Sequence, residues 1–495
     1  MRGRFLLAID AGTSSTRTVI YDHQARVVSS AQQEFAQHYP QPGWVEHDPE
    51  EIWTAVQAVT AEAMQSAAAA ASDITGIGIT NQRETTVLWE RASGRCIYNA
   101  IVWQDRRTAS ACDAMKADGA EAMITARTGL RLDPYFSASK ISWLLDNVPG
   151  ARERAAAGEL AFGTIDSFIL WRLSKGRVHA TDASNASRTM LFNIHTQEWD
   201  EELLALFAVP RNLLPEVHDC AHRFGDADCA ALGGTVPVLG IAGDQQAALI
   251  GQAGFRRGMT KSTYGTGCFV LANSAGEALQ SNNQLLTTVA SRLDGKVCYG
   301  LEGSVFVAGS ALQWLRDELG LIRSAAESEA IARKTGVVSD VCVVPAFTGL
   351  GAPYWDPYAR GAILGLTRGS GREQIVTATL QAIALQTSDL IEAMTDDGFA
   401  PEVIRVDGGM VQNNWFLQFL ADILKLPVER PANVESTALG AACLAGLCAG
   451  VYGSTDVIAS MWQSERVFTP AMGDDQRGAL LAAWKTAVQR VRSSA

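Results

Sequence analysis

The stretch FLLAIDAGTSSTRTVIY, residues 5–21, decides the fold class of this chain. Residues 5–9 form a compact apolar run, which is typical of a buried β-strand. Residues 11–15 are small, and residues 18–21 are again rich in types that favour strands. We therefore predict a hairpin whose turn carries no bulky side chain.

The turn of this hairpin is a candidate phosphate-binding site. Small residues let the backbone approach a phosphate closely, and successive N–H groups can form a nest for an anion. Asp10, at the end of the first strand, can hold Mg²⁺ through water. Further donors and a cation come from Thr13, Ser14, Ser15 and Arg17. Taken alone, the motif fits an ordinary tight hairpin equally well, but the chain has no Gly-x4-Gly-Lys-Ser/Thr sequence, which excludes a P-loop.

Outward from the hairpin, helix and strand signals alternate. Asp48 suits the N-cap of a helix, Pro49 its first position, and Glu51 the second half of a capping box. We predict that this helix runs to about residue 70. Residues 74–80 predict another strand, followed by a polar loop at 81–85. Such alternation indicates an α/β fold.

The pattern restarts near the middle of the chain. Residues 259–272 again predict a strand, a glycine turn and a strand. Residues 403–407 predict a further strand, and we expect a helix from about 414 to 424. No low-complexity linker separates the halves. We therefore predict two closely packed domains, 1–251 and 252–495, with a ligand-binding cleft between them.

Three glycine turns follow apolar strands in this arrangement. They are residues 10–15, Tyr264-Gly265-Thr266-Gly267, and Asp407-Gly408-Gly409, the last followed by Asn413 and Asn414 at the start of a helix. Glycines before a helix bring N–H groups and the positive end of the helix dipole to a nucleotide. Each turn is a weak signal alone, but together the three favour nucleotide binding.

A second group of residues has the chemistry of a polyol-binding site. Arg83 offers a fork of donors and Glu84 offers an acceptor, so the pair can hydrogen-bond vicinal hydroxyls, although a surface ion pair is the commoner arrangement. Trp103 and Tyr135 can pack on the C–H face of a polyol or equally fill a core. Asp244 follows an apolar run and is a candidate general base, with a helix N-cap as the alternative.

Composition excludes several classes of protein. Of the 495 residues, 47 % are hydrophobic and 19 % charged, so the chain can bury large cores. A net charge of −12 argues against nucleic acid and anionic lipid as partners. Nine irregularly spaced cysteines without a Cys-x-x-Cys pair indicate reduced thiols, and the apolar runs are too short to cross a bilayer. We therefore expect a cytoplasmic protein.

The motifs together resemble a known family over nearly the whole chain. The chain resembles the FGGY carbohydrate kinases, and among these the members that phosphorylate glycerol. The resemblance is carried by PGWVEHDP at 42–49, GITNQRETT at 78–86, NASRTM at 185–190, GDQQ at 243–246, YGTGCF at 264–269 and GLGAPYWD at 349–356.

The resemblance implies two actin-like (ribonuclease-H-like) domains that close over MgATP and phosphorylate glycerol, the first step of glycerol utilisation. It implies catalytic roles for Asp244 as general base, for Arg83, and for Asp10 as the acid associated with Mg²⁺ through water. The implied acceptor site comprises Arg83, Glu84, Trp103, Tyr135, Asp244, Gln245 and Phe269. The implied nucleotide site comprises Thr13, Ser14, Ser15, Arg17, Thr266, Gly309, Gln313, Gly409 and Asn413. The expected partners are glycerol, ATP or ADP, and further copies of the chain in a homo-oligomer (dimer or tetramer), without nucleic acid or stable membrane association.

Two departures from similar enzymes bear on function. Ala11 stands where they usually carry Gln, and it is compatible with a backbone cradle. The loop at 226–235 lacks the Gly-Gly-Lys-Gly-Gly-Thr-Arg pattern that binds fructose 1,6-bisphosphate in enteric relatives, so this regulation is not carried over. The segment from about Phe468 likewise departs from the part of those relatives that docks a sugar-transport regulator.

Other functions stay open at this point. A kinase of a larger sugar is disfavoured by Arg83 and Glu84 with Trp103. An actin-like ATPase of a filament or chaperone would bind nucleotide with no small acceptor. A binding module without catalysis is the weakest alternative, because the glycine turns and the carboxylate would then lack a purpose.

Overall fold

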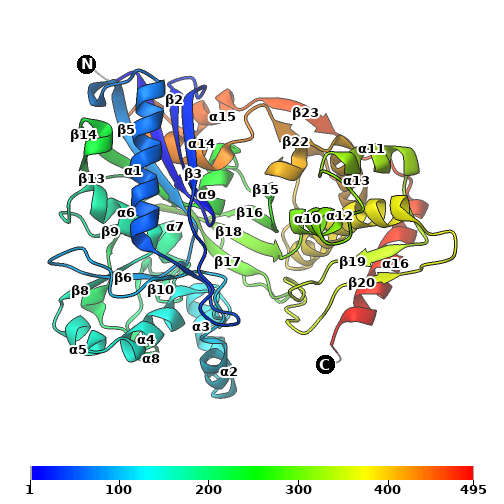
Figure 1. Ribbon diagram of the computed structural model, residues 1–495, viewed down its shortest axis with the longest axis horizontal. Helices are drawn as coiled ribbons and strands as arrows, with labels where there is room; N and C mark the ends of the chain where they lie inside the picture. Colours follow the sequence, from blue (N-terminus) through cyan, green and yellow to red (C-terminus); the bar gives the residue numbers. More distant parts are fainter. Residues whose placement is uncertain (1–2, 494–495) are drawn as a thin grey trace.

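The computed structural model of this chain describes residues 3–493 and contains two large mixed β-sheets, one in each half of the molecule (Figure 1). In the first sheet, β1 (Phe5–Ala11) pairs antiparallel with β2 (Ser15–Asp22) and parallel with β5 (Ile74–Asn81). The sheet is completed by β3 (Val27–Glu34), β13 (Ala221–Cys229) and β14 (Gly234–Gly243). The predicted hairpin over residues 5–21 is therefore confirmed.

The second sheet is built around a second hairpin. Strand β15 (Met259–Tyr264) pairs antiparallel with β16 (Cys268–Ala275) and parallel with β21 (Val403–Asp407). The remaining strands are β17 (Leu286–Leu293), β18 (Lys296–Val305), β22 (Val428–Pro431) and β23 (Ser464–Phe468). The prediction of a strand, a glycine turn and a strand at residues 259–272 is therefore confirmed as a hairpin.

The two sheets share one arrangement of strands, although the chain reaches the last strand differently, because β13 precedes β14 whereas β23 follows β22. The order β3-β2-β1-β5-β14-β13 corresponds to β18-β16-β15-β21-β22-β23, and each pair of neighbours has the same relative direction in both sheets. Strand β17 extends the second sheet at one edge. A sequence echo only a few residues long therefore marks a repeat of five strands in the same order and directions.

Helices and short strands surround the two sheets. The helices are α1 (Pro49–Ser66), α2 (Ala109–Ala117), α3 (Glu121–Thr128), α4 (Ser137–Asn147), α5 (Ala151–Ala156), α6 (Ile165–Leu173), α7 (Ala183–Ala186), α8 (Glu201–Leu206), α9 (Asp244–Gly251), α10 (Gly309–Asp317), α11 (Glu327–Thr335), α12 (Arg372–Asp396), α13 (Asn414–Leu424), α14 (Ser436–Cys448), α15 (Thr455–Met461) and α16 (Asp474–Val491). The short strands are β4 (Glu46–His47), β6 (Val87–Glu90), β7 (Ala100–Ile101), β8 (Leu160–Gly163), β9 (Ala180–Asp182), β10 (Phe192–Asn193), β11 (Glu198–Trp199), β12 (Glu216–His218), β19 (Cys342–Val344) and β20 (Ala362–Leu364). Within residues 3–493, no helix combines the length and apolar character needed to span a bilayer.

Helix α1 begins as the sequence predicts, apart from one contact. Asp48 is the N-cap, and its carboxylate accepts from the N–H of Glu50 at 2.8 Å. The predicted capping box is wrong, because the Glu51 carboxylate accepts from the backbone N–H of Ala36 at 3.2 Å. Glu51 therefore ties the helix to the chain after β3, a contact that local sequence cannot reveal.

Helix α14 joins the two halves. It lies in the second half of the chain, yet Ala441 and Leu444 pack in one buried cluster with Leu6 of β1. It crosses α9 so closely that a Cβ at Gly440 would overlap the carbonyl oxygen of Ala247. Small residues on both helices permit this approach, so the halves form one packed body around the α9–α14 crossing (Figure 1).

Candidate functional site

The candidate site lies where three parallel strands of the first sheet end. Strands β1, β5 and β14 run parallel to one another, so their C-terminal ends meet at one edge of the sheet. Asp10 stands near the end of β1, Arg83 and Glu84 follow β5, and Asp244 follows β14. The topology therefore brings together four side chains that are far apart in the sequence.

Arg83 is the centre of this cluster. Its guanidinium is buried and binds both carboxylate oxygens of Glu302 on β18, with Nη1–Oε2 at 2.5 Å and Nη2–Oε1 at 3.1 Å. Its Nε lies 3.2 Å from Oδ1 of Asp244. Burial alone would raise the pKa of Glu302, but Arg188 and Arg83 outweigh it and lower the pKa to about 2. Glu302 therefore stays ionised and holds one edge of Arg83.

Glu84 occupies a strained position beside Arg83. Its φ of 61° is left-handed, which is uncommon for a residue other than glycine and concentrates at functional sites. Its Oε1 accepts from Nε of Arg188 at 2.6 Å. Burial raises the pKa of Glu84, and the nearby guanidinium groups of Arg188 and Arg83 oppose that rise. Glu84 is thus a buried acceptor that is held on one side by a guanidinium.

Aromatic rings wall this polar cluster. The ring of Trp103 lies edge-on to Tyr135, with centroids 5.4 Å apart, and edge-on to Phe269 at 6.2 Å. The indole N–H of Trp103 donates to Oγ1 of Thr13 in the first glycine turn at 3.0 Å. An apolar wall beside paired donors and acceptors suits the C–H face and the hydroxyls of a small polyol.

Asp244 is the first residue of α9 rather than its N-cap. The N-cap is Gly243, which decides against the alternative suggested by sequence. The carboxylate is partly exposed and accepts from the N–H of Gln245 at 2.7 Å. The amide oxygen of Gln245 in turn accepts from the buried ammonium of Lys261 on β15. Asp244 thus combines access to a ligand with a rigid helix start.

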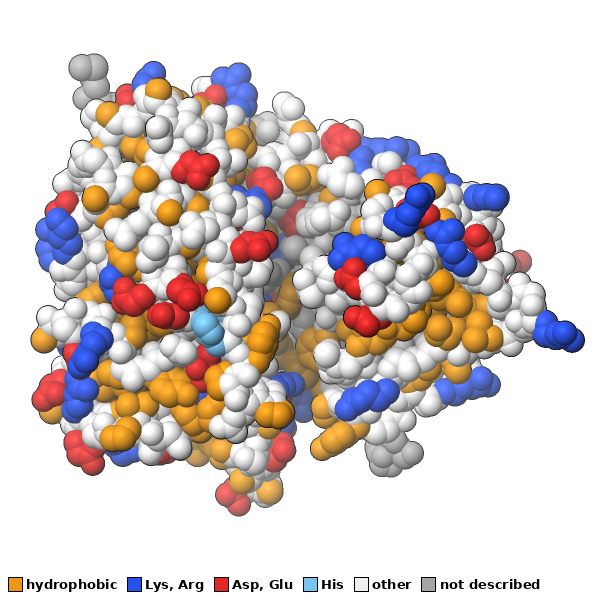
Figure 2. Space-filling view, in the orientation of Figure 1, with side chains coloured by type: hydrophobic (Ala, Val, Ile, Leu, Met, Phe, Trp, Pro, Cys, Tyr) orange, Lys and Arg blue, Asp and Glu red, His pale blue; other side chains and the backbone are white. Residues whose placement is uncertain are grey.

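Arg83 and the residues around it form the acceptor cluster, which comprises Glu84, Trp103, Tyr135, Asp244, Gln245 and Phe269. A cavity of about 400 Å³ adjoins this cluster and lies between the two halves. It is lined from the first half by Asp10, Gly12, Ser15 and Arg17, and from the second half by Thr263, Asp407, Gly408, Gly409, Gln412, Val434, Glu435, Ser436 and Thr437. Figure 2 shows the surface hollowed between the two halves. The first and third glycine turns therefore face each other across one space.

Asp10 is one of three carboxylates that line this cavity, together with Asp407 and Glu435. Burial raises its pKa to about 7, with a further contribution from Asp244, while Arg17 opposes the rise. A cation bound in the cavity would favour the ionised form of the Asp10 carboxylate. Ser15 and Asp407 line the same cavity and add oxygen donors, which are the ligands that Mg²⁺ prefers. This donor set fits Mg²⁺.

Arg17 and the second glycine turn are engaged in other contacts. The Arg17 guanidinium pairs with the Glu435 carboxylate across the cavity. In the second turn, the carbonyl of Gly265 accepts from Gly309 and that of Thr266 accepts from Ala308, both at 2.9 Å. These bonds fix the turn to the start of α10.

Not every predicted nucleotide residue lines the cavity. Asn413 caps α13 by accepting from the N–H of Phe416 at 2.9 Å. The remaining predicted residues outside the lining are Thr13, Ser14, Thr266, Gly309 and Gln313. The seven predicted acceptor residues, by contrast, are linked by ion pairs, hydrogen bonds and ring contacts into one cluster with Glu302, Arg188 and Lys261.

Sequence reasoning missed several charged residues of the site. Glu302, Lys261 and Arg188 are buried with their charges, and Glu435 lines the cavity. Asp407 also lines it; the sequence placed this residue in the third glycine turn without giving it a role. The available signal was a lone charge in a stretch of uncharged residues: Lys261 in MTKSTY at 259–264, and Glu302 in GLEGSV at 300–305. Arg188 stands in the quoted NASRTM motif without an assigned role. Their partners come from distant strands, so local sequence gave no reason to choose them.

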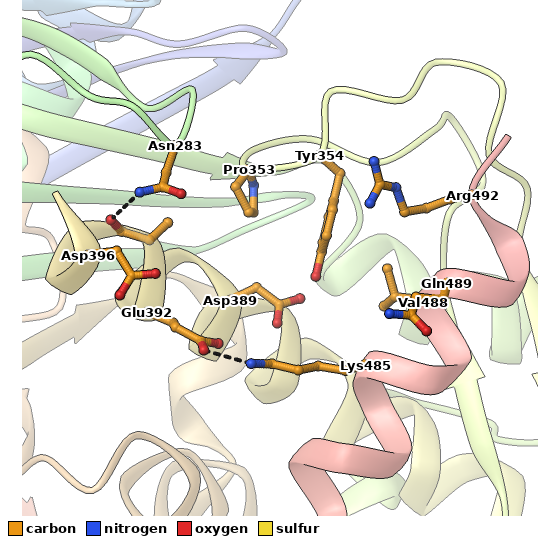
Figure 3. A pocket seen from close by; sticks show the side chains of 11 residues that line it. Asn283, Pro353, Tyr354, Asp389, Glu392, Asp396, Lys485, Val488, Gln489 and Arg492 are labelled. Carbon is orange, nitrogen blue, oxygen red and sulfur yellow. Dashed lines mark hydrogen bonds and ion pairs between the residues drawn. The ribbon is translucent and has the colours of Figure 1, made fainter. Parts of the chain in front are cut away.

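A second cavity, of about 250 Å³, lies apart from this site between α12, α16 and residues 353–354 (Figure 3). The Asp389 carboxylate points into it and accepts from the indole N–H of Trp484 at 2.8 Å. Glu392 pairs with Lys485 at 2.6 Å. The lining of this cavity shares no residue with the cluster around Arg83.

Comparison with known proteins adds the family. The N-terminal domain of the FGGY family of carbohydrate kinases matches residues 5–251, and the C-terminal domain of that family matches residues 260–449. The chain belongs to the FGGY family of carbohydrate kinases. Among relatives of this FGGY kinase, Glycerol kinase 1 of Pseudomonas aeruginosa is 60 % identical over 491 residues, covering 99 % of both chains. Glycerol kinase of Rhodospirillum centenum is 58 % identical, covering 99 % of this chain and 98 % of that one.

Solved structures support the same family. A crystal structure of Plasmodium falciparum glycerol kinase with ADP is 37 % identical and superposes with a TM-score of 0.93 over 99 % of both chains. A gluconate kinase of Lactobacillus acidophilus, 22 % identical with a TM-score of 0.88 over 98 % of this FGGY kinase and 97 % of that chain, shows the shared fold alone. The α/β fold with two actin-like domains, expected from the resemblance, is confirmed.

Proposed function

We propose that this FGGY kinase transfers the γ-phosphoryl group of ATP to glycerol, giving sn-glycerol 3-phosphate and ADP as the first step of glycerol utilisation. The observation that carries the proposal is the 60 % identity to Glycerol kinase 1 of Pseudomonas aeruginosa over 99 % of both chains. The aromatic wall and the paired charges of the acceptor cluster are compatible with so small a polyol.

The acceptor would lie against Arg83 and Glu84. Arg83 donates to hydroxyl oxygens and Glu84 accepts from hydroxyl hydrogens, so the pair orients vicinal hydroxyls. Trp103, Tyr135 and Phe269 would wall the carbon chain and limit its length, with Gln245 beside the reacting end. Rigid placement of this kind makes the transfer effectively unimolecular.

Asp244 is proposed as the general base. It accepts the proton of the terminal hydroxyl as that oxygen bonds to the γ-phosphorus and the bond from phosphorus to the bridging oxygen of ADP breaks. The guanidinium of Arg83, 3.2 Å from Asp244, keeps the carboxylate oriented. Phosphoryl transfer passes through a loose transition state in most analyses, so positioning and charge neutralisation supply most of the catalysis.

The nucleotide would occupy the cavity between the halves. Gly12, Ser15 and Gly409 line it and let backbone approach the phosphates, and Arg17 brings a cation. We propose nucleotide contacts for Thr13, Ser14, Ser15, Arg17, Thr266, Gly309, Gln313, Gly409 and Asn413. Asp10 would hold Mg²⁺ through water, with Ser15 and Asp407 nearby. When bound, Mg²⁺ neutralises phosphate charge.

Three further proposals concern the whole chain. We place the boundary of the two domains between residues 251 and 252, supported by the sheet change between β14 and β15. We propose a cytoplasmic protein and a homo-oligomer, dimer or tetramer. Light scattering of the purified chain measures the oligomer directly.

A coupled ADP-release assay over glycerol, dihydroxyacetone, xylulose and gluconate tests the main proposal. Glycerol should give the highest kcat/KM, and phosphorus NMR of the product should show a single phosphomonoester on a terminal carbon. A better rate with xylulose or gluconate would indicate a kinase of a larger acceptor. ATP turnover that no acceptor stimulates, together with polymerisation or peptide binding, would instead indicate an actin-like ATPase.

A further inference from the structure

Two buried residues behind the acceptor cluster come from different halves of the molecule. Glu302 lies in the middle of β18, between β16 and β17 of the second sheet, and Arg188 follows α7 in the first half. Their side chains meet, with Nη2 of Arg188 2.9 Å from Oε1 of Glu302. Both side chains are almost fully buried. Such a pair is costly to desolvate, so its contacts call for an explanation.

Each member of the pair holds one residue of the proposed acceptor site. Glu302 binds Arg83 through both oxygens, at 2.5 and 3.1 Å, which fixes the plane of that guanidinium. Arg188 donates from Nε to Oε1 of Glu84 at 2.6 Å. The four side chains form an alternating chain of charges, from Arg83 to Glu302 to Arg188 to Glu84.

Within residues 3–493, the contacts leave one N–H of Nη2 of Arg83 and Oε2 of Glu84 for a ligand. Glu302 takes one N–H of each terminal nitrogen of Arg83, Nη1 also donates to Oε1 of Gln246 at 3.3 Å, and Nε lies 3.2 Å from Oδ1 of Asp244. Among residues 3–493, the hydrogen bonds of Glu84's carboxylate are to Oε1, from Arg188, and none reaches Oε2. An acceptor would therefore meet side chains whose other faces are already anchored.

Arg188 also supports the aromatic wall. Its guanidinium carbon lies 5.7 Å from the ring centroid of Tyr135 and 5.3 Å from that of Phe136. Nη1 of Arg188 is buried and has no hydrogen-bond partner among the described residues. Attraction between the Arg188 cation and the two aromatic rings offsets the energetic cost of the missing hydrogen bond at Nη1. Arg188 thus reaches two members of the acceptor site, Glu84 and Tyr135.

On the basis of the proposed function, we propose that Glu302 and Arg188 are positioning residues that assemble the acceptor site across the two halves. Arg83 and Glu84 then reach their working geometry only when β18 of the second half is in place behind them. The pair would therefore link the relative position of the halves to acceptor binding, without touching the acceptor. A displacement of about 1 Å in such a site can cost on the order of 10²-fold in rate.

Two substitutions test this role. Glu302→Gln keeps the shape but sets an amide N–H against a guanidinium, and Arg188→Lys keeps the charge but can retain only one of the two carboxylate contacts. We expect Glu302→Gln to raise the KM for glycerol about 10- to 100-fold and Arg188→Lys to raise it less. The KM for ATP should stay within about threefold in both.

Asp389→Asn is the matched control, because it also alters a buried carboxylate that accepts a hydrogen bond, far from the cleft. It should shift Tm and leave the KM for glycerol unchanged. The inference is overturned if folded Glu302→Gln or Arg188→Lys keeps the wild-type KM for glycerol, or if the KM values for glycerol and ATP rise by the same factor. If neither variant folds, the pair serves folding and the positioning role is overturned.

The wild-type measurement separates the two proposals. Wild-type turnover of glycerol with unchanged KM values in the variants refutes the positioning role alone. A wild-type enzyme that does not phosphorylate glycerol refutes the proposed function, and the positioning role falls with it.

Discussion

The two hairpins of the molecule have the same topology and different chemistry. In the first, Asp10 precedes the turn with Gly12 and Thr13; in the second, Thr263 stands before Gly265 and Thr266. Both Asp10 and Thr263 line the cavity between the halves. The first hairpin therefore brings a carboxylate to this space, whereas the second brings a hydroxyl.

The same contrast holds for the strands beside the hairpins. Strand β5 is followed by Arg83 and Glu84, which belong to the acceptor cluster, but β21 is followed by Gly408 and Gly409. The two equivalent strands therefore end differently: charged residues follow β5, and glycines follow β21. The difference teaches that the fold positions strand ends, while the residues at those ends decide the chemistry that each half brings to the space between them.

Removal of the carboxylate after β14 is expected to have the largest effect. Asp244→Asn should lower kcat on the order of 10²–10⁴-fold, because the amide cannot accept the hydroxyl proton. Steady-state kinetics with glycerol and ATP measure this, and circular dichroism confirms the fold. Turnover near the wild-type value would show that Asp244 is not the general base. The charged residues at the strand ends of the first sheet would then have no assigned role in proton transfer.

The glycine turns should respond unequally to a methyl group. Gly408 has φ of 92°, and a Cβ there would lie 2.5 Å from the carbonyl oxygen of Tyr264, whereas at Gly12 the nearest atom, the carbonyl oxygen of Ser15, is 3.3 Å away. We expect Gly408→Ala to raise the KM for ATP by about tenfold or more through backbone strain, and Gly12→Ala to change it less. Equal effects would show that local strain does not distinguish the turns.

Asp10 should make the stability of the free protein depend on pH. Its pKa of about 7 in the folded chain lies above the ordinary 3.8, so the unfolded chain releases this proton at lower pH. This contribution therefore destabilises the fold increasingly as pH rises from about 4 to 7. Asp10→Asn should raise Tm relative to wild type at pH 8 and much less at pH 4.

Calorimetry of both proteins at the two pH values isolates Asp10, since other buried carboxyls such as Asp389 are common to both. Added Mg²⁺ should stabilise the wild type at pH 8 more than the variant. A Tm difference that is independent of pH would contradict the expected titration of Asp10.

The smallest effect is expected where the halves meet at the surface. Glu435→Gln releases Arg17 from its ion pair, and a partly exposed pair of this kind contributes on the order of 1 kcal/mol or less. If Arg17 binds phosphate as proposed, Glu435 competes for it, and the KM for ATP should fall by about two- to fivefold in this variant. Arg17→Ala is the control and should raise it. A rise in Glu435→Gln would show that the ion pair assists nucleotide binding.

Local patterns predicted much of the fold. The hairpin at residues 5–21, the strand at 403–407 and the helix from 414 to 424 follow from apolar runs, glycines and the cap at Asn413. The predicted capping box at Glu51 was wrong, because the Glu51 carboxylate accepts from the backbone N–H of Ala36, which belongs to another segment. Contacts with near neighbours in sequence were predictable, and those with distant segments were not.

The sequence by itself determined the α/β class, the family and the side chains with the chemistry of the site: Asp10, Arg83, Glu84 and Asp244. Only the tertiary structure decided which charges hold them. Arg83 meets Glu302 across 219 positions of sequence, and Glu84 meets Arg188 across 104. The physical reason is that a buried charge must find an opposite charge, and the packing of distant strands decides which one is within reach.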